Sequence, residues 1–141
     1  QGCDSHKEDP LTNLMLTVDA QRWSYARIHV LAHELCGGKW VALGGGGYDW
    51  AGVVPRAWTH LVAIAAGHPI DVDTAVPPSW REVVNDLSGI ETPKTMGDGV
   101  SLYVKEPTGY FDPMSQLDRS ILRTREAVFP YLGLDPDPES F

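Results

Sequence analysis

The chain has 141 residues, of which 43% are hydrophobic, so it is long and apolar enough to bury the core of one domain of ordinary size. Its formal net charge of −8 argues against binding nucleic acid unaided and against docking on an anionic membrane, because both need clustered Lys and Arg. No apolar run has the length of a membrane span. The two cysteines, Cys3 and Cys36, form no disulfide framework and favour two buried thiols in a reducing cytoplasm.

The beginning of the chain predicts a loop followed by a helix. Residues 1–16 are rich in turn-forming residues and predict a long ordered loop. The helix is expected to start near Thr17, a suitable N-cap, and to stop at Gly37 and Gly38. Its apolar face recurs at helical spacing: Tyr25, Ile28, Ala32 and Leu35. The polar start without Met leads us to expect that the chain begins inside a larger protein.

The middle of the chain predicts an α/β arrangement. Residues 39–43 are a short apolar run bounded by glycines, which favours a buried strand. Four glycines follow, and then a second helix over roughly 50–66, with Val54, Trp58, Leu61 and Ala65 on one face. Helix, strand, loop and helix in this order are typical of a mostly parallel sheet. A single strand leaves backbone groups unpaired on both edges, so we expect more sheet than this chain supplies.

The last part of the chain is less regular. We expect a short helix near 79–87, in which Trp80, Val83, Val84 and Leu87 are apolar. Residues 88–114 predict an irregular surface excursion. A last helix is expected over 115–127 with Ser115 as N-cap, and an acidic tail over 135–139 ends the structure. The predicted buried side of this helix is Leu117, Ile121 and Val128.

The glycine run at residues 44–47 is the most informative feature. Consecutive glycines cost backbone entropy, unless the chain needs positive φ angles or a close approach of the backbone to another group. Ligands of α/β proteins bind where the strands end, which is where this run lies. A flexible linker and a nucleotide-binding loop are alternatives, but the absence of a following Gly-Lys-Ser/Thr excludes a P-loop.

Two side chains near this loop could carry chemistry. The phenol of Tyr48 could donate a hydrogen bond to a developing oxyanion, although the spacing alone favours an ordinary core tyrosine with its hydroxyl at the surface. Asp9 precedes a proline and could be a fixed metal ligand, or it could only shape a turn. Asp4 and His6 have the residue types of zinc ligands but lack further partners, and we interpret them as loop structure.

Two histidines share a helical face. His29 and His33 stand four residues apart, a spacing that could hold a metal, but no H-E-x-x-H pattern accompanies them. We interpret them as part of a solvated face.

Three stretches resemble the arginase–deacetylase superfamily and, within it, the histone-deacetylase-like proteins. They are Gly2-Cys3-Asp4-Ser5 with Asp9-Pro10-Leu11, then Leu16-Thr17, then Leu43-Gly44-Gly45-Gly46-Gly47-Tyr48 with Arg56-Ala57-Trp58-Thr59. The resemblance covers roughly residues 1–66, and residues 127–135 are similar to bacterial acetoin-utilization proteins. It implies that residues 1–141 are the C-terminal segment of a single deacetylase domain, with the N-terminal part absent. The implied fold is the C-terminal part of a three-layer α/β fold with a mostly parallel sheet, in which residues 67–141 add C-terminal helices and an irregular excursion.

The resemblance also implies roles for individual residues. Asp9 matches a metal ligand, and Tyr48 matches the tyrosine that polarises the scissile amide carbonyl and stabilises the oxyanion. Gly46 and Gly47 match glycines that line an acyl-lysine tunnel. Glu8 stands where many relatives have Gly.

The implied activity is hydrolysis of N-acetyl amides with Zn²⁺, or Fe²⁺, as cofactor. The expected substrate is an acetylated lysine on a protein or a small acetylated amine. The family's Asp-x-His ligand pair and catalytic His pair are absent from this sequence, so we expect the isolated chain to bind metal poorly and to be inactive, with the rest of the same deacetylase domain as its partner. The alternative is a non-catalytic α/β binding or interaction module that uses the glycine loop.

Overall fold

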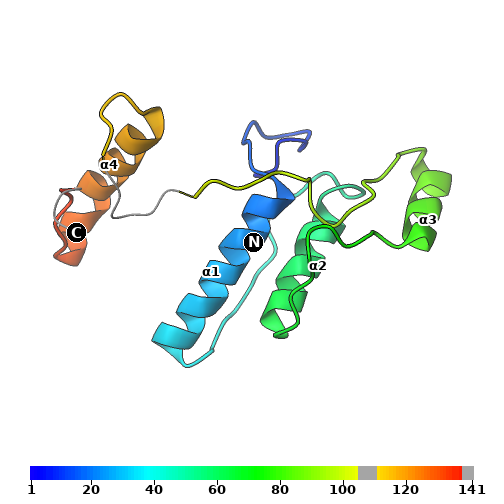
Figure 1. Cartoon of the computed structure of the whole chain (residues 1–141), viewed down its shortest axis with the longest axis horizontal. Coiled ribbons are helices and arrows are strands. Elements are labelled where there is room, and N and C mark those ends of the chain that lie inside the picture. Colours follow the sequence, from blue (N-terminus) through cyan, green and yellow to red (C-terminus); the bar gives the residue numbers. More distant parts are fainter. Residues whose placement is uncertain (105–110, 138–141) are drawn as a thin grey trace. The chain divides into compact units, whose positions relative to one another are not determined.

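The computed structural model describes residues 1–104 and 111–137. It divides into two compact units, Gln1–Leu102 and Tyr103–Phe141. The first contains α1 (Val18–Cys36), α2 (Val54–Ala65) and α3 (Pro78–Ser88), and the second contains α4 (Gln116–Val128) and the 3₁₀ helix η1 (Phe129–Leu132) (Figure 1). None of the helices in the described ranges is long and apolar enough to cross a membrane.

The predicted boundaries of α1 are confirmed by its caps. The Thr17 hydroxyl accepts the N–H of Ala20, and Gly37 closes the helix in the left-handed conformation with φ 58°. Tyr25 and Ala32 of the predicted apolar face are buried, whereas Leu35 is 75% exposed. The cysteine prediction is half wrong: Cys3 is buried, but Cys36 lies at the helix end and is exposed.

The predicted strand at residues 39–43 is not formed, and the described residues contain no β-strand. The segment is extended. At its end the Leu43 carbonyl accepts a hydrogen bond from the Gln1 amine at 2.6 Å, and just beyond it the Gly46 carbonyl accepts the N–H of Cys3 at 2.6 Å. A strand needs a continuous ladder, and no neighbouring segment provides one here. The predicted parallel sheet is therefore not observed in the part of the chain that the structure describes.

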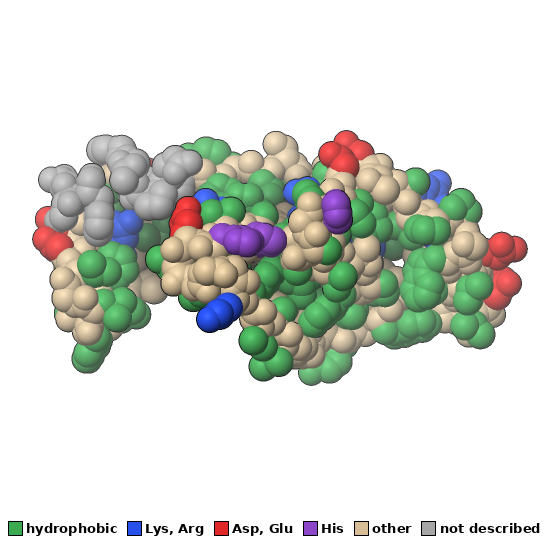
Figure 2. All heavy atoms as spheres, turned by 90° about the horizontal axis from the view of Figure 1, so that it is seen from below, with side chains coloured by type: hydrophobic (Ala, Val, Ile, Leu, Met, Phe, Trp, Pro, Cys, Tyr) green, Lys and Arg blue, Asp and Glu red, His purple; other side chains and the backbone are tan. Residues whose placement is uncertain are grey.

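The extended segment nevertheless alternates as a strand would. Trp40 and Ala42 pack against the buried cluster of Tyr25, Leu61 and Ile64, which joins α1 to α2. Val41 and Leu43 point the other way and are 82% and 71% exposed. Figure 2 shows hydrophobic side chains spread over the face in view, which agrees with the many large apolar residues that are exposed. The segment thus has one apolar face packed on helices and a second apolar face uncovered.

The α2 helix is shorter than predicted and buries a different face. It begins at Val54 because the Asp49 carboxylate and carbonyl accept backbone N–H groups and shape a turn over residues 49–53. Of the predicted stripe only Leu61 is buried, and the residues buried along the helix are Arg56, Ala57, His60, Leu61 and Ile64. Two of them are polar because they bind the segment 95–98: His60 Nε2 donates to the Met96 carbonyl at 3.1 Å.

The remaining predictions are partly corrected. The helix expected near 79–87 is α3, but of its apolar residues only Val84 is buried. Residues 89–104 have no helix, as predicted, but they are not simply a surface excursion, because Thr92 and Met96 are buried and the Asp98 side chain is only 11% exposed. Positions 105–110 and 138–141 of the predicted excursion and tail lie outside the described residues.

The second unit confirms the helix predicted at 115–127. Ser115 caps α4 by accepting the N–H of Asp118, and Asp118 is itself buried and accepts the N–H of Asp112 at 2.7 Å. The predicted buried side is wrong for the described unit, because Leu117, Ile121 and Val128 are between 38% and 53% exposed.

Candidate functional site

The loop that carries Asp9 is held by its own hydrogen bonds. The His6 carbonyl accepts the N–H of Asp9 at 3.0 Å, and Lys7 and Leu16 pair across the loop, where the Lys7 N–H donates to the Leu16 carbonyl at 2.9 Å. The Thr12 hydroxyl donates to the Asp4 carbonyl. Glu8 is accommodated without strain, since no residue other than glycine has a positive φ in the described ranges. The loop is therefore ordered, as the sequence predicts.

The structure places Asp9 directly against Tyr48. Asp9 Oδ2 accepts the backbone N–H of Tyr48 at 2.9 Å, and Oδ1 accepts the N–H groups of Leu11 at 2.9 Å and Thr12 at 3.2 Å. Asp9 is 7% exposed, whereas Tyr48 is 49% exposed. The two candidate residues come together, through the backbone of Tyr48, although they lie far apart in the sequence, and Tyr48 is half-exposed rather than packed in the core.

The same contacts fix the charge of Asp9. Burial alone would raise the pKa of this carboxyl group, but the three backbone N–H groups that it accepts stabilise the carboxylate more strongly, so its pKa lies below the ordinary value. Asp9 is therefore ionised at neutral pH, which is the form that a metal ligand requires. A carboxylate has about four acceptor positions, and the three N–H groups leave one of them on Oδ2.

Close packing excludes side chains at the two glycines that precede Tyr48. A Cβ on Gly46 would overlap the Asp4 carboxylate. Gly47 has φ +149°, and a Cβ there would lie 2.9 Å from Val54 Cγ2 and 3.1 Å from Cys3 Cβ. These positions allow the backbone to pass between the first loop and α2, which agrees with a loop shaped by close approach rather than a flexible linker.

We expect Gly47→Ala to lower the free energy of unfolding by about 1–3 kcal/mol, because the added methyl group combines a strained φ with overpacking. Urea unfolding followed by circular dichroism measures this. Gly44→Ala is the matched control in the same run, since its Cβ would meet only Trp58 Cζ2 at 3.8 Å, and a change below about 0.5 kcal/mol is expected. Equal stability of the two variants would contradict the packing argument.

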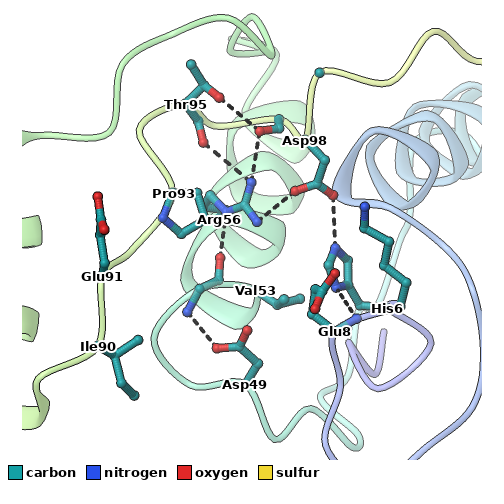
Figure 3. Close-up of a pocket in the computed structure, with 14 residues that line it drawn as sticks. His6, Glu8, Asp49, Val53, Arg56, Ile90, Glu91, Pro93, Thr95 and Asp98 are labelled. Carbon is teal, nitrogen blue, oxygen red and sulfur yellow. Dashed lines mark hydrogen bonds and ion pairs between the residues drawn. The ribbon is translucent and has the colours of Figure 1, made fainter.

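A second polar cluster lies beside this site and was not predicted. His6, Arg56 and Asp98 meet at a hollow of about 500 Å³ (Figure 3). His6 Nε2 is 2.9 Å from Asp98 Oδ2, and Arg56 Nη2 is 2.9 Å from Asp98 Oδ1. The interpretation of His6 as mere loop structure is therefore incomplete. The one sequence signal was an arginine inside a largely apolar helix, since a buried arginine needs a partner.

The two histidines on the α1 face, His29 and His33, are also in contact. The Nε2 atoms of His29 and His33 lie 2.9 Å apart, and the Trp40 ring packs edge-on to His29. His33 is exposed and His29 is half-buried, so the solvated face is confirmed only for His33.

The described residues do not form a complete metal centre. Within residues 1–104 and 111–137, no three His, Cys, Asp or Glu side chains gather in a way that could hold a metal ion. Asp9, with its free acceptor position, fits the requirement for one ligand of a divalent cation, and further ligands are needed to complete such a site.

The sequence of this chain is similar to known proteins in two comparisons. Residues 1–65 match the histone deacetylase domain. The acetoin utilization protein AcuC of Bacillus subtilis (strain 168) is 40% identical over 106 residues, which are 75% of this chain and 27% of that protein. AcuC of Staphylococcus aureus (strain Mu50 / ATCC 700699) is 33% identical and AcuC of Staphylococcus xylosus is 29% identical over the same shares. The chain thus spans 27% of the length of these curated relatives. No solved structure matches.

Proposed function

Because this chain belongs to the histone deacetylase-like proteins of the acetoin-utilization type, we propose that it is the part of a metal-dependent deacetylase that supplies one metal ligand and the oxyanion donor. The enzyme hydrolyses N-acetyl amides. The observation that carries the proposal is the hydrogen bond of 2.9 Å between Asp9 Oδ2 and the backbone N–H of Tyr48. This bond holds the residue of the oxyanion donor next to the carboxylate of the metal ligand.

Asp9 binds the cation in this proposal. Its carboxylate is buried, ionised and held by three backbone N–H groups, so it would keep its direction when a divalent ion takes the remaining acceptor position. Zn²⁺, or Fe²⁺, supplies Lewis-acid polarisation of the acetyl carbonyl and of a water molecule when it is bound. The other ligands and the general base come from the rest of the same deacetylase domain. The resemblance assigns the Asp-x-His ligand pair to an earlier loop, and this sequence has no His-His motif.

Tyr48 stabilises the oxyanion. Tyr48 is half-exposed, and its backbone N–H is bonded to Asp9, so its hydroxyl would donate a hydrogen bond to the carbonyl oxygen of an acetyl group bound beside Asp9. Gly46 and Gly47 precede it in a crowded backbone where no side chain fits, and we assign them to the wall of the acyl-lysine tunnel.

The uncovered segment 39–43 supports the need for the rest of the domain. Trp40 and Ala42 pack inward while Val41 and Leu43 are more than two-thirds exposed, which is the pattern of a strand between two apolar layers. We assign this segment to the parallel sheet of the deacetylase fold, with neighbouring strands from outside residues 1–141. In that assignment residues 1–141 belong to a single domain, which stays a prediction.

The substrate class is an acetylated lysine on a protein or a small acetylated amine. The net charge of −8 favours a cationic or neutral substrate over a nucleic acid. We place the protein in the cytoplasm, because the two cysteines of this chain, Cys3 and Cys36, are free thiols.

The proposal is tested by comparing the whole protein that carries this chain with the isolated 141-residue chain. We expect the whole protein to bind one zinc ion per molecule and to release acetate from an acetyl-lysine peptide, with the activity lost on chelation and restored by zinc. The isolated chain should show neither, because a single carboxylate does not hold zinc. Elemental analysis of the metal and an acetate-release assay provide the two measurements.

Each half of this comparison can fail separately. A whole protein that binds its substrate without turnover would favour the non-catalytic binding module. Stoichiometric zinc and turnover in the isolated chain would contradict the missing-ligand argument while leaving deacetylation in place.

A further inference from the structure

The Asp98 carboxylate joins three parts of the first unit (Figure 3). Its Oδ2 accepts the N–H of Val18 at 2.7 Å, at the start of α1, and lies 2.9 Å from His6 Nε2. Its Oδ1 lies 2.9 Å from Arg56 Nη2 on α2. The Asp98 side chain is only 11% exposed, and it comes from a segment without regular secondary structure. Asp98 also lies beyond the residues that match the histone deacetylase domain.

On one side, Asp98 acts on the loop that carries Asp9. The His6 ring is 1% exposed, and its Nδ1 accepts the N–H of Glu8 at 3.1 Å. Because Nδ1 is an acceptor, Nε2 carries the proton and donates it to Asp98. The His6 carbonyl in turn accepts the N–H of Asp9. The imidazole therefore fixes the backbone up to the candidate metal ligand.

On the other side, Asp98 acts on the turn that follows Tyr48. The buried Arg56 donates from Nε to the Gly52 carbonyl at 2.5 Å. The N–H of Gly52 donates to Asp49 Oδ1 at 2.6 Å, and Asp49 is the next residue after Tyr48. The ion pair between Arg56 and Asp98 thus reaches the residue adjacent to the oxyanion donor.

The segment around Asp98 is itself held in place. The Asp98 N–H donates to Asp19 Oδ2 at 2.8 Å, and Asp19 is buried in the first turn of α1. A Cβ on Gly97 would lie 2.8 Å from Asp19 Oδ1 and 2.7 Å from Val72 Cβ, so only glycine fits this approach. Arg56 Nη1 also donates to the Gly97 carbonyl at 2.9 Å. These contacts let Asp98 serve as a fixed anchor.

The charge of Asp98 agrees with this arrangement. Burial would raise the pKa of its carboxyl group, but the hydrogen bonds from His6 and Val18 and the positive charge of Arg56 together hold that pKa well below its usual range. The carboxylate is therefore ionised at neutral pH and pairs with donors on both sides.

From this geometry we propose that Asp98 is a positioning residue that sets the spacing between Asp9 and Tyr48. It acts on Asp9 through His6 and on Tyr48 through Arg56, and it does not itself touch the substrate. This inference rests on the proposed function, because the spacing matters only if Asp9 binds the metal and Tyr48 acts on the substrate.

The test is Asp98→Asn in the whole protein, which keeps the side-chain size but removes the charge and one acceptor. We expect zinc affinity to fall about 10–100-fold, as for other residues that orient metal ligands, and kcat to fall while KM changes little. Hydrogen exchange in residues 5–12 and 48–53 should become at least about tenfold faster, because both segments lose their anchor. Wild-type zinc affinity together with unchanged exchange in both segments would overturn the proposal.

Two further variants separate positioning from general stability. Val84→Ala removes a buried side chain on α3 outside the network, so it should destabilise the protein while zinc affinity and exchange in the two segments stay unchanged. His6→Gln can place an amide N–H near the position of Nε2, and should keep more zinc affinity than His6→Ala. Equal zinc affinity in the two His6 variants would count against transmission through this hydrogen bond.

The hydrogen-exchange measurement is independent of catalysis. If the wild-type protein neither binds zinc nor releases acetate, the proposed function fails, while faster exchange in both segments of Asp98→Asn still supports the anchoring role. If zinc binding and turnover are present but Asp98→Asn is indistinguishable from wild type, the proposed function stands and the positioning role fails.

Discussion

Replacing Tyr48 by Phe is expected to lower kcat of the whole enzyme by about 10²–10³-fold, the usual effect of removing one oxyanion donor. KM should change little, because the ring is kept and the hydroxyl is needed mainly in the transition state. The backbone N–H that binds Asp9 is also kept, so the metal ligand should hold its position. Steady-state kinetics with an acetyl-lysine peptide, together with zinc analysis of the variant, measure both effects.

Tyr131→Phe is the matched control for this experiment. Tyr131 is 90% exposed on η1, so loss of its hydroxyl should leave kcat within about twofold of wild type. If Tyr48→Phe raised KM as strongly as it lowered kcat/KM, with kcat unchanged, the hydroxyl would be a binding group and the oxyanion role would be wrong.

The helices could be predicted from the sequence because their ends are encoded locally. Thr17 and Ser115 each accept a backbone N–H three residues later, and Gly37 takes up the left-handed conformation that a side chain would resist. Such signals depend only on neighbours within one helical turn. They therefore hold whatever surrounds the helix.

The strand prediction at residues 39–43 failed for the opposite reason. An apolar run with β-branched and aromatic residues indicates a segment that suits a sheet, but a strand exists only when another segment pairs with it. Trp40 and Ala42 still face the helices as strand residues would, so the local part of the prediction was sound. The missing part is non-local and cannot be read from these residues.

The buried face of α2 shows a second limit of sequence reasoning. Apolar spacing predicts that Val54, Trp58, Leu61 and Ala65 line one face. Of these only Leu61 is buried, and the structure buries Arg56 on the same helix. Arg56 becomes buried because Asp98 and the Gly97 carbonyl satisfy its donors. Periodicity counts hydrophobic residues and does not detect a partner that the chain supplies much later.

The candidate site also divides into residues that local motifs identify and residues whose partners lie far away in the sequence. Asp9 and Tyr48 could be selected because both lie in short motifs, and the structure brings them within one hydrogen bond. His6 and Asp98 could not be paired, because a single histidine in a loop and an aspartate in an irregular segment carry no mutual signal. The motifs that carry the family resemblance also end near residue 66 and do not include Asp98.

Replacing Asp9 by Asn is expected to abolish stoichiometric zinc binding in the whole enzyme and to remove turnover. The amide is neutral and a poorer ligand than the carboxylate, so affinity should fall by at least about 100-fold, more than for a residue that only orients a ligand. The amide NH₂ must also face a backbone N–H: either that of Tyr48 or those of Leu11 and Thr12. At least one hydrogen bond is lost in either orientation, so the loop should also move relative to Tyr48.

Glu8→Gln is the matched control, because it removes the neighbouring carboxylate in the same loop. Glu8 is exposed. Its backbone N–H donates to His6 Nδ1, and the substitution keeps this hydrogen bond. Zinc titration by calorimetry should therefore give wild-type affinity for Glu8→Gln and a large loss for Asp9→Asn. If both variants bound zinc as wild type does, the cation would have to be held elsewhere, and the three N–H groups around Asp9 would serve only to shape a turn.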